Sequence, residues 1–168
     1  MSSFASHDQH VLDSLVAIVA AYLFALPIGL ERRAGGVSHV GLRTLPLVSV
    51  GACAYLLLGR YLYERGIFES DGEARMLRAV MTGIGFIGGG AIFKAPARGK
   101  GAGGITTAGA VWATGAIGAS VAHGYYEVAA VLAVKSLFVV GISERLLTRR
   151  ERRRQQRRRR ALEKEPEG

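Results

Sequence analysis

Long stretches without charge constrain this 168-residue chain more than any other feature. No Asp, Glu, Lys or Arg occurs in residues 14–30, 44–59, 79–93 or 101–126, and in residues 128–143 the only one is Lys135. A helix needs roughly 17–25 mostly apolar residues to cross a bilayer, and five such stretches leave little polar surface for a soluble domain. The sequence therefore predicts an integral membrane protein, built as an all-α polytopic bundle of about five transmembrane helices.

The predicted spans are drawn around these stretches, and the loops between them set a topology. The spans cover residues 11–30, 42–59, 76–93, 105–122 and 125–142. Lys and Arg number 17 in the first and third loops plus the tail, against 4 in the second loop and the N-terminus. The positive-inside rule then places residues 1–10 outside and the C-terminus in the cytoplasm. The second loop also carries four acids, so we expect its arginines to pair locally.

Residues 144–168 form a basic cytoplasmic tail, which holds 11 of the 22 Lys and Arg. Such a run beside a span is typical of binding to anionic lipid headgroups, at about 1 kcal/mol per basic residue. The alternatives are a topology signal without a ligand and, ranked third, non-specific attraction to nucleic acid. The predicted lipid-binding residues are Arg149, Arg150, Arg152, Arg153, Arg154, Arg157, Arg158, Arg159 and Arg160.

Five glycines lie between Gly83 and Gly90, in the third predicted span. They match the dinucleotide fingerprint by letter, but that motif needs an acid about 20 residues later, and residues 74–126 contain none. Two interpretations stay open. Small residues four apart, such as Gly85 and Gly89, let two helices approach closely. Alternatively, the helix is broken at residues 88–90, where unwound carbonyls would bind a cation.

Other functional groups are few. Lys135 is the one charge well inside an apolar stretch, where a structural salt bridge and a functional charge are equally compatible with the sequence. Glu31 and Arg43 are possible partners across the first loop, with simple anchoring of the helix ends as the alternative. We find no nucleophile–base set or paired-carboxylate site, so no enzyme activity is expected. Cys53 is the only cysteine, which excludes an internal disulfide and favours a buried apolar role.

Three segments carry a family resemblance: "IGLERRAGGVSHVGLRT", "DGEARMLRAVMTGIGFIGGGAIF" and "GGITTAGAVWATGAIG". In order and spacing they resemble the signature blocks of the MgtC/SapB family of bacterial inner-membrane proteins. The resemblance implies a membrane domain associated with magnesium-limited growth, acid stress and survival inside hosts. It also implies either magnesium transport or regulation of other membrane proteins, the rotary ATP synthase among them.

The resemblance also assigns functional positions to this chain. They are Glu31, Arg32, Gly41, Arg43, Thr44, Asp71, Arg75, Gly83, Gly85, Gly88, Gly90, Thr106, Thr107, Trp112 and Gly118. Asp71 and Glu31 are the weak candidates for a metal, and magnesium is the only cofactor that the resemblance suggests. Two departures, Arg33 and Arg78, put cations where relatives carry an acid or an amide. The tail stands where many relatives have a soluble domain.

The leading functional hypothesis is a modulator of ion or energy homeostasis that acts through partners in the bacterial cytoplasmic membrane. In it, Asp71 and Arg75 organise the outer end of the third span, while Glu31, Arg32 and Arg43 organise the inner side. The glycine faces of the third and fourth spans form the centre and make self-association reasonable. The alternatives are a magnesium transporter or channel subunit, and a lipid-binding scaffold. No specific nucleic-acid partner is expected.

Overall fold

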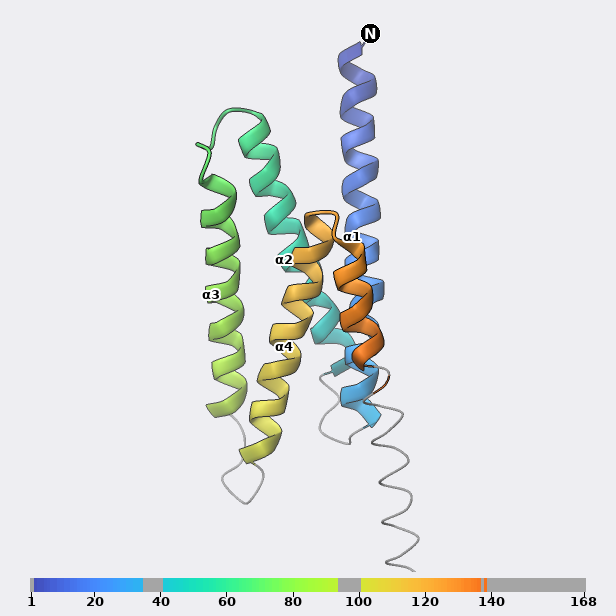
Figure 1. Ribbon diagram of the computed structural model, residues 1–168, viewed down its shortest axis with the longest axis vertical. Helices are drawn as coiled ribbons and strands as arrows, with labels where there is room; N and C mark the ends of the chain where they lie inside the picture. Colours follow the sequence, from blue (N-terminus) through green and yellow to red (C-terminus); the bar gives the residue numbers. More distant parts are fainter. Residues whose placement is uncertain (1, 35–40, 94–100, 137, 139–168) are drawn as a thin grey trace, which may run out of the picture.

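The computed structural model describes residues 2–34, 41–93, 101–136 and 138, and this part is helical with no strand (Figure 1). The helices are α1 (Ser2–Ala34), α2 (Gly41–Glu64), α3 (Gly72–Phe93) and α4 (Gly101–Ala122), followed by a fifth helical segment at residues 126–136. The predicted all-α class is confirmed.

Four of the predicted spans lie inside helices that are long and apolar enough to cross a membrane. The apolar windows are His10–Arg32, Gly41–Glu64, Gly72–Phe93 and Gly104–Ala122. The helices run past the predicted bounds because charged residues continue them: Arg60 and Glu64 pair one turn apart on α2. The fifth predicted span lies partly outside the described residues and the tail entirely so, and both stay predictions, as does the orientation.

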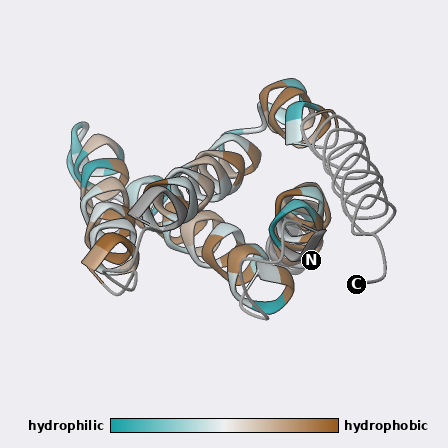
Figure 2. Ribbon diagram, turned by 90° about the horizontal axis from the view of Figure 1, so that it is seen from below, coloured by the Kyte–Doolittle hydropathy of each residue, from teal (hydrophilic) through white to brown (hydrophobic). Residues whose placement is uncertain are grey.

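α2 and α4 form the centre of the bundle, with α1 and α3 on opposite flanks (Figures 1 and 2). α1 packs on α2 and α4, and α3 packs on the same two helices, while α1 and α3 make no contact within the described ranges. Burial follows this order, since half of the α4 window is buried but only 11% of the α3 window. The outward faces of the flanking helices remain apolar, as bilayer contact requires.

The two ends of the bundle differ in character (Figure 1). At the end that we call the α1–α2 end, α1 and α3 finish while α2 and α4 begin. At the opposite, α2–α3 end, two glycines with positive φ, Gly66 (68°) and Gly124 (79°), terminate α2 and α4. Each sits in a Schellman turn: Gly124 N–H bonds Val121 O at 3.0 Å and Tyr125 N–H bonds Ser120 O at 2.9 Å.

α1, α2 and α4 meet at one fully buried polar residue. Ser49 of α2 donates its hydroxyl to the Ala21 carbonyl of α1 at 2.9 Å. On its other side the Ser49 backbone touches Gly118 of α4, where an added Cβ would collide with the Ser49 carbonyl oxygen. Ile117, Cys53 and Ala21, all 0% exposed, fill the surroundings. The bundle is thus locked at a crossing that only a glycine at position 118 permits.

α3 is continuous through Gly88, Gly89 and Gly90, so the broken-helix interpretation of this segment is wrong. The packing interpretation is right, with a different set of glycines. A Cβ at Gly88 would lie 3.6 Å from Ala108 Cβ and 3.6 Å from Trp112 Cδ1. One at Gly85 would lie 3.8 Å from Trp112 Cζ2, whereas Gly89 has no neighbour within 4 Å. On the α4 side, a Cβ at Gly115 would collide with the Ile84 side chain, so α3 contacts α4 through Ile84, Gly85 and Gly88.

Candidate functional site at the α1–α2 end

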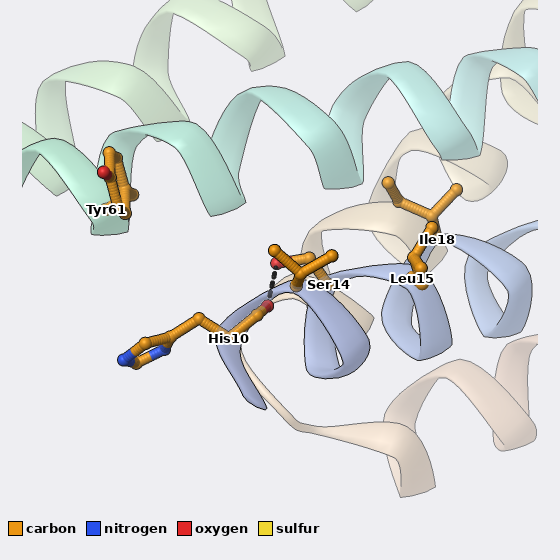
Figure 3. A pocket seen from close by; sticks show the side chains of 6 residues that line it. His10, Ser14, Leu15, Ile18 and Tyr61 are labelled. Carbon is orange, nitrogen blue, oxygen red and sulfur yellow. Dashed lines mark hydrogen bonds between the residues drawn. The ribbon is translucent and has the colours of Figure 1, made fainter. Parts of the chain in front are cut away.

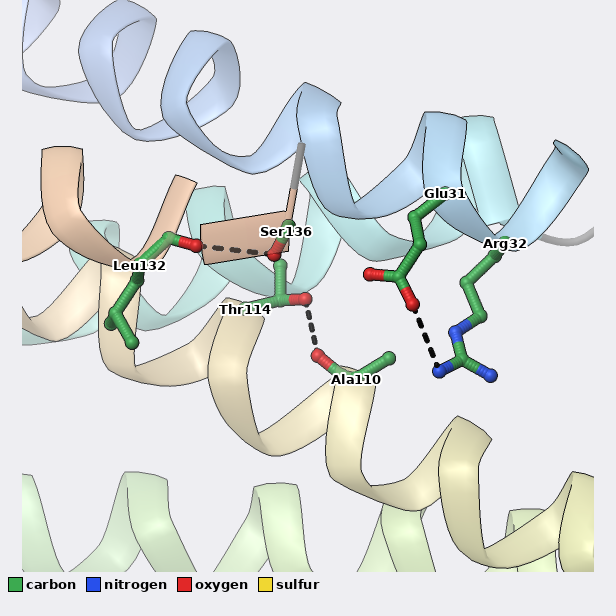
Figure 4. Close-up of polar contacts among 6 residues, drawn as sticks. All are labelled: Glu31, Arg32, Ala110, Thr114, Leu132 and Ser136. Atoms are coloured by element: carbon green, nitrogen blue, oxygen red, sulfur yellow. Dashed lines mark hydrogen bonds and ion pairs between the residues drawn. The ribbon is translucent and has the colours of Figure 1, made fainter. Parts of the chain in front are cut away.

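Glu31 and Arg32 form an ion pair at the end of α1, with Arg32 Nη2 3.5 Å from Glu31 Oε1. The side chains are only 16% and 19% exposed, for Arg32 and Glu31 respectively. Both point from α1 toward α4 (Figure 4). Arg32 Nε is buried and has no hydrogen-bond partner among the residues that the structure describes. Such a mostly buried, incompletely satisfied charge is unusual for a helix end.

Two glycines create the space for this pair. Gly29 of α1 faces Gly41 of α2, and a Cβ at Gly29 would lie 3.0 Å from the Gly41 carbonyl oxygen. A Cβ at Gly41 would lie 2.7 Å from Arg32 Cβ, closer than such atoms approach. Because neither residue has a side chain, the end of α1 rests on the first turn of α2. The family position Gly41 thus has a steric role beside Arg32.

Several hydroxyl groups lie on α2, α4 and the fifth segment. Thr114 is fully buried and donates to Ala110 O at 2.5 Å, and Ser136 donates to Leu132 O at 3.1 Å. Figure 4 shows both on the side of α4 and the fifth segment that faces Glu31. Thr44, Thr106 and Thr107, in the first two turns of α2 and α4, each have an interaction partner.

The structure thus brings one group of predicted positions together and separates others from it. Glu31, Arg32, Gly41, Arg43, Thr44, Thr106 and Thr107 belong to the helix ends at the α1–α2 end. Glu31 pairs with Arg32, and no Glu31–Arg43 pair is found within the described ranges; the Arg43 side chain is exposed. Gly83 and Gly90 have nothing within 4 Å of an added Cβ.

Asp71 and Arg75 lie at the other end of the bundle, where, within the described residues, the expected local pairing is confirmed for Arg60 and Arg75 but not for Arg65. Arg75 Nη2 is 2.7 Å from Asp71 Oδ1 and 3.8 Å from Glu69 Oε2, and Arg60 Nε is 3.1 Å from Glu64 Oε1. These side chains are mainly exposed, so each pair contributes at most about 1 kcal/mol.

The two weak metal candidates cannot share one ion. Asp71 precedes α3 at the α2–α3 end, whereas Glu31 lies at the α1–α2 end (Figure 1). Within the described residues, no group of three or more His, Cys, Asp or Glu side chains is arranged to hold a metal. Among the described side chains, Glu31 is paired with the Arg32 guanidinium, which already neutralises the carboxylate.

Sequence reasoning missed two residues that position this site, Gly29 and Ser49. A serine inside an otherwise apolar stretch was the available signal for Ser49. The exposed Lys135 side chain has no carboxylate within ion-pair distance among the described residues, so the salt-bridge interpretation finds no support there.

Comparisons with known proteins agree on one family. A sequence profile of the MgtC family matches residues 18–149. "Putative magnesium transporter YhiD" of Escherichia coli K12 is 30% identical over 139 residues, covering 80% of this chain and 62% of that protein. "Protein SrpB" of Synechococcus elongatus is 30% identical over 116 residues (66% and 63%), and "Protein MgtC" of Brucella abortus is 30% identical over 131 residues (77% and 49%). The chain thus spans about half to two thirds of these relatives. No solved structure matches.

Proposed function

Because this chain belongs to the MgtC family of membrane proteins, we propose that it modulates magnesium or energy homeostasis by acting on other proteins of the bacterial cytoplasmic membrane. Adaptation to magnesium limitation and acid stress is the setting that the family resemblance suggests. The observation that carries this proposal is the Glu31–Arg32 pair, whose buried Arg32 Nε lacks a partner in the described part of the chain. A partner's acceptor would contact the part of the Arg32 side chain that stays exposed, 16%, at the α1–α2 end.

The packing of the centre supports modulation over conduction. Ions crossing the described bundle between α1, α2 and α4 would have to pass Ser49, Thr114 and Ile117, each 0% exposed. Close-packed interiors of this kind do not deform continuously to admit a hydrated ion. Magnesium keeps several of its waters and favours oxygen ligands, and a carboxylate already paired with arginine is a poor entry point.

The outer surface offers ample area for partners in the bilayer. Large apolar side chains are exposed along α1, α3 and the fifth segment, including Phe86 (84%) and Phe93 (91%) on α3. The rotary ATP synthase and a second copy of the chain are the first partners to test. The basic tail, which lies outside the described residues, would add attachment to anionic headgroups.

Genetic complementation tests the modulator proposal. A strain lacking this protein is grown at limiting magnesium with either the wild-type gene, Arg32→Gln or Arg43→Gln. We expect Arg32→Gln to abolish rescue and the exposed Arg43→Gln to retain most of it. Cross-linking from the α1–α2 end should then recover a membrane protein with the wild type and lose it with Arg32→Gln. Equal rescue by both variants would contradict a role for the pair.

Magnesium transport is the second candidate, favoured by the printed name of the YhiD relative. Purified protein in liposomes loaded with a magnesium-sensitive dye distinguishes the two functions. Modulation predicts the same flux as in protein-free liposomes. Flux well above that level and lost with Asp71→Ala would overturn the modulator proposal.

A further inference from the structure

A groove of about 230 Å³ opens between α1 and α2 near the α2–α3 end (Figure 3). Its wall on α1 consists of His10, Val11, Ser14, Leu15 and Ile18, and its wall on α2 is Tyr61. The Ser14 hydroxyl donates to the His10 carbonyl at 2.8 Å, so it is satisfied within α1. Below His10 the groove therefore presents an apolar surface.

The groove follows from how α1 and α2 cross. The two helices touch through Gly29 and Gly41 at the α1–α2 end and through Ser49 and Ala21 further along, and they diverge toward the other end (Figure 1). From Val11 to Ile18 the groove descends about 10 Å along α1, at 1.5 Å per residue. His10 and Glu64 mark the ends of the two apolar windows. The groove thus runs from the headgroup region into the hydrocarbon of one leaflet, which is roughly 15 Å deep.

The groove residue Tyr61 carries a cation, Arg65, one helical turn further along the chain. The Arg65 guanidinium lies 5.0 Å from the centre of the Tyr61 ring and donates to the Tyr61 hydroxyl. The Schellman turn at Gly66 fixes the chain at this point, with Ile67 N–H bonded to Leu62 O at 3.0 Å. Arg60 is neutralised by Glu64, whereas no described carboxylate lies within ion-pair distance of Arg65. Arg65 therefore offers its charge to an anion outside the described chain.

We propose that the groove binds one phospholipid, with an acyl chain along Val11, Leu15 and Ile18 and the phosphate at Arg65 and Tyr61. The groove is smaller than the roughly 300–1,000 Å³ of typical small-molecule pockets, which suits a single chain. The cation beside Tyr61 and the apolar wall match the two parts of a phospholipid.

Photolabelling in vesicles tests the proposal. The full chain is reconstituted in phosphatidylethanolamine and phosphatidylglycerol with a trace of phosphatidylglycerol that carries a diazirine in its acyl chain. After irradiation, adducts are mapped by mass spectrometry on two faces of α1 at equal depth. The groove face is Val11, Leu15 and Ile18, and the control face is Leu12, Val16 and Val19, which are 61%, 62% and 56% exposed. We expect labelling to concentrate on the groove face.

Matched variants separate a site from ordinary lipid contact. Leu15→Trp should fill the groove and equalise labelling of the two faces, whereas Val16→Trp should leave the preference intact. Arg65→Gln should lower labelling of the groove face by about fivefold, which is the contribution of one basic residue near the headgroups to lipid binding. Arg75→Gln, at the same end of the bundle, is the control and should leave this labelling unchanged. Tyr61→Phe should lower it in the same direction.

A phosphate-free probe tests the headgroup contact. Diazirine diacylglycerol should label the groove face more weakly than the phospholipid and should not respond to Arg65→Gln. Equal labelling of both faces in the wild type would overturn the proposal. Equal labelling by the two probes would also overturn it, because the groove would then bind acyl chains without recognising the phosphate.

Discussion

Gly118→Ala tests the helix crossing on which the site depends. A methyl group at position 118 would collide with the Ser49 carbonyl oxygen and lie 2.9 Å from Ser49 C and 3.0 Å from Ser49 Cα. All three are backbone atoms and cannot rotate away. Since carbon atoms pack at about 3.5–4.0 Å, α2 and α4 must separate by up to about 1 Å at this point.

The energy of this change is the sum of two terms. Overpacking a tight core costs about 1–3 kcal/mol. Moving α2 also weakens the 2.9 Å hydrogen bond from Ser49 to Ala21, and interhelical bonds in membranes average about 0.6 kcal/mol. We therefore expect Gly118→Ala to lower the free energy of unfolding by about 2–3 kcal/mol. That corresponds to roughly a 30- to 150-fold change in the unfolding equilibrium.

The measurement is reversible unfolding in mixed micelles with increasing SDS, followed by circular dichroism. Gly109→Ala is the matched control, because position 109 is on the same helix and has no neighbour within 4 Å. It should unfold within about 0.5 kcal/mol of the wild type or be slightly more stable. Ser49→Ala should cost about 0.6–1.7 kcal/mol alone and much less in the Gly118→Ala background. Equal stability of the two glycine variants would refute the crossing.

Three further predictions concern the flanking contacts. Gly88→Leu should separate α3 from α4 and lower the free energy of unfolding by about 1–3 kcal/mol, while Gly89→Leu should be near neutral. The only tryptophan, Trp112, lies beside position 88, so its fluorescence emission should shift in Gly88→Leu and not in Gly89→Leu. Arg32→Gln should destabilise by about 1–2 kcal/mol because Glu31 loses its partner, and adding Glu31→Gln should recover part of that loss in a double-mutant cycle. Arg75→Gln should change stability by less than about 1 kcal/mol, an effect that 0.5 M salt should reduce further, since its pairs are exposed.

Part of this architecture could be predicted from the sequence because it depends on local properties. Stretches without charge predict the membrane helices, since a charged side chain in hydrocarbon costs several kcal/mol wherever the helix packs. The Arg75–Asp71 pair was also predictable, because its members are four residues apart at a helix start. The family blocks located Glu31, Arg32 and Gly41 as positions of interest.

The contacts between helices could not be predicted in the same way. In lipid, buried and exposed faces of a helix are both apolar, so hydropathy does not say which face packs inward. The sequence could therefore not choose Gly85 and Gly88 over Gly89 as the contacts of α3.

The same reason applies to the site and to the groove. Glu31 pairs with its neighbour Arg32 instead of Arg43, at the point where Gly29 and Gly41 bring the ends of α1 and α2 together. The groove exists because α1 and α2 diverge beyond the contacts of Gly29 with Gly41 and of Ala21 with Ser49. Composition along the chain determined that these helices enter a membrane; distances between their backbones decided which residues meet there, because only residues without side chains allow the closest approach.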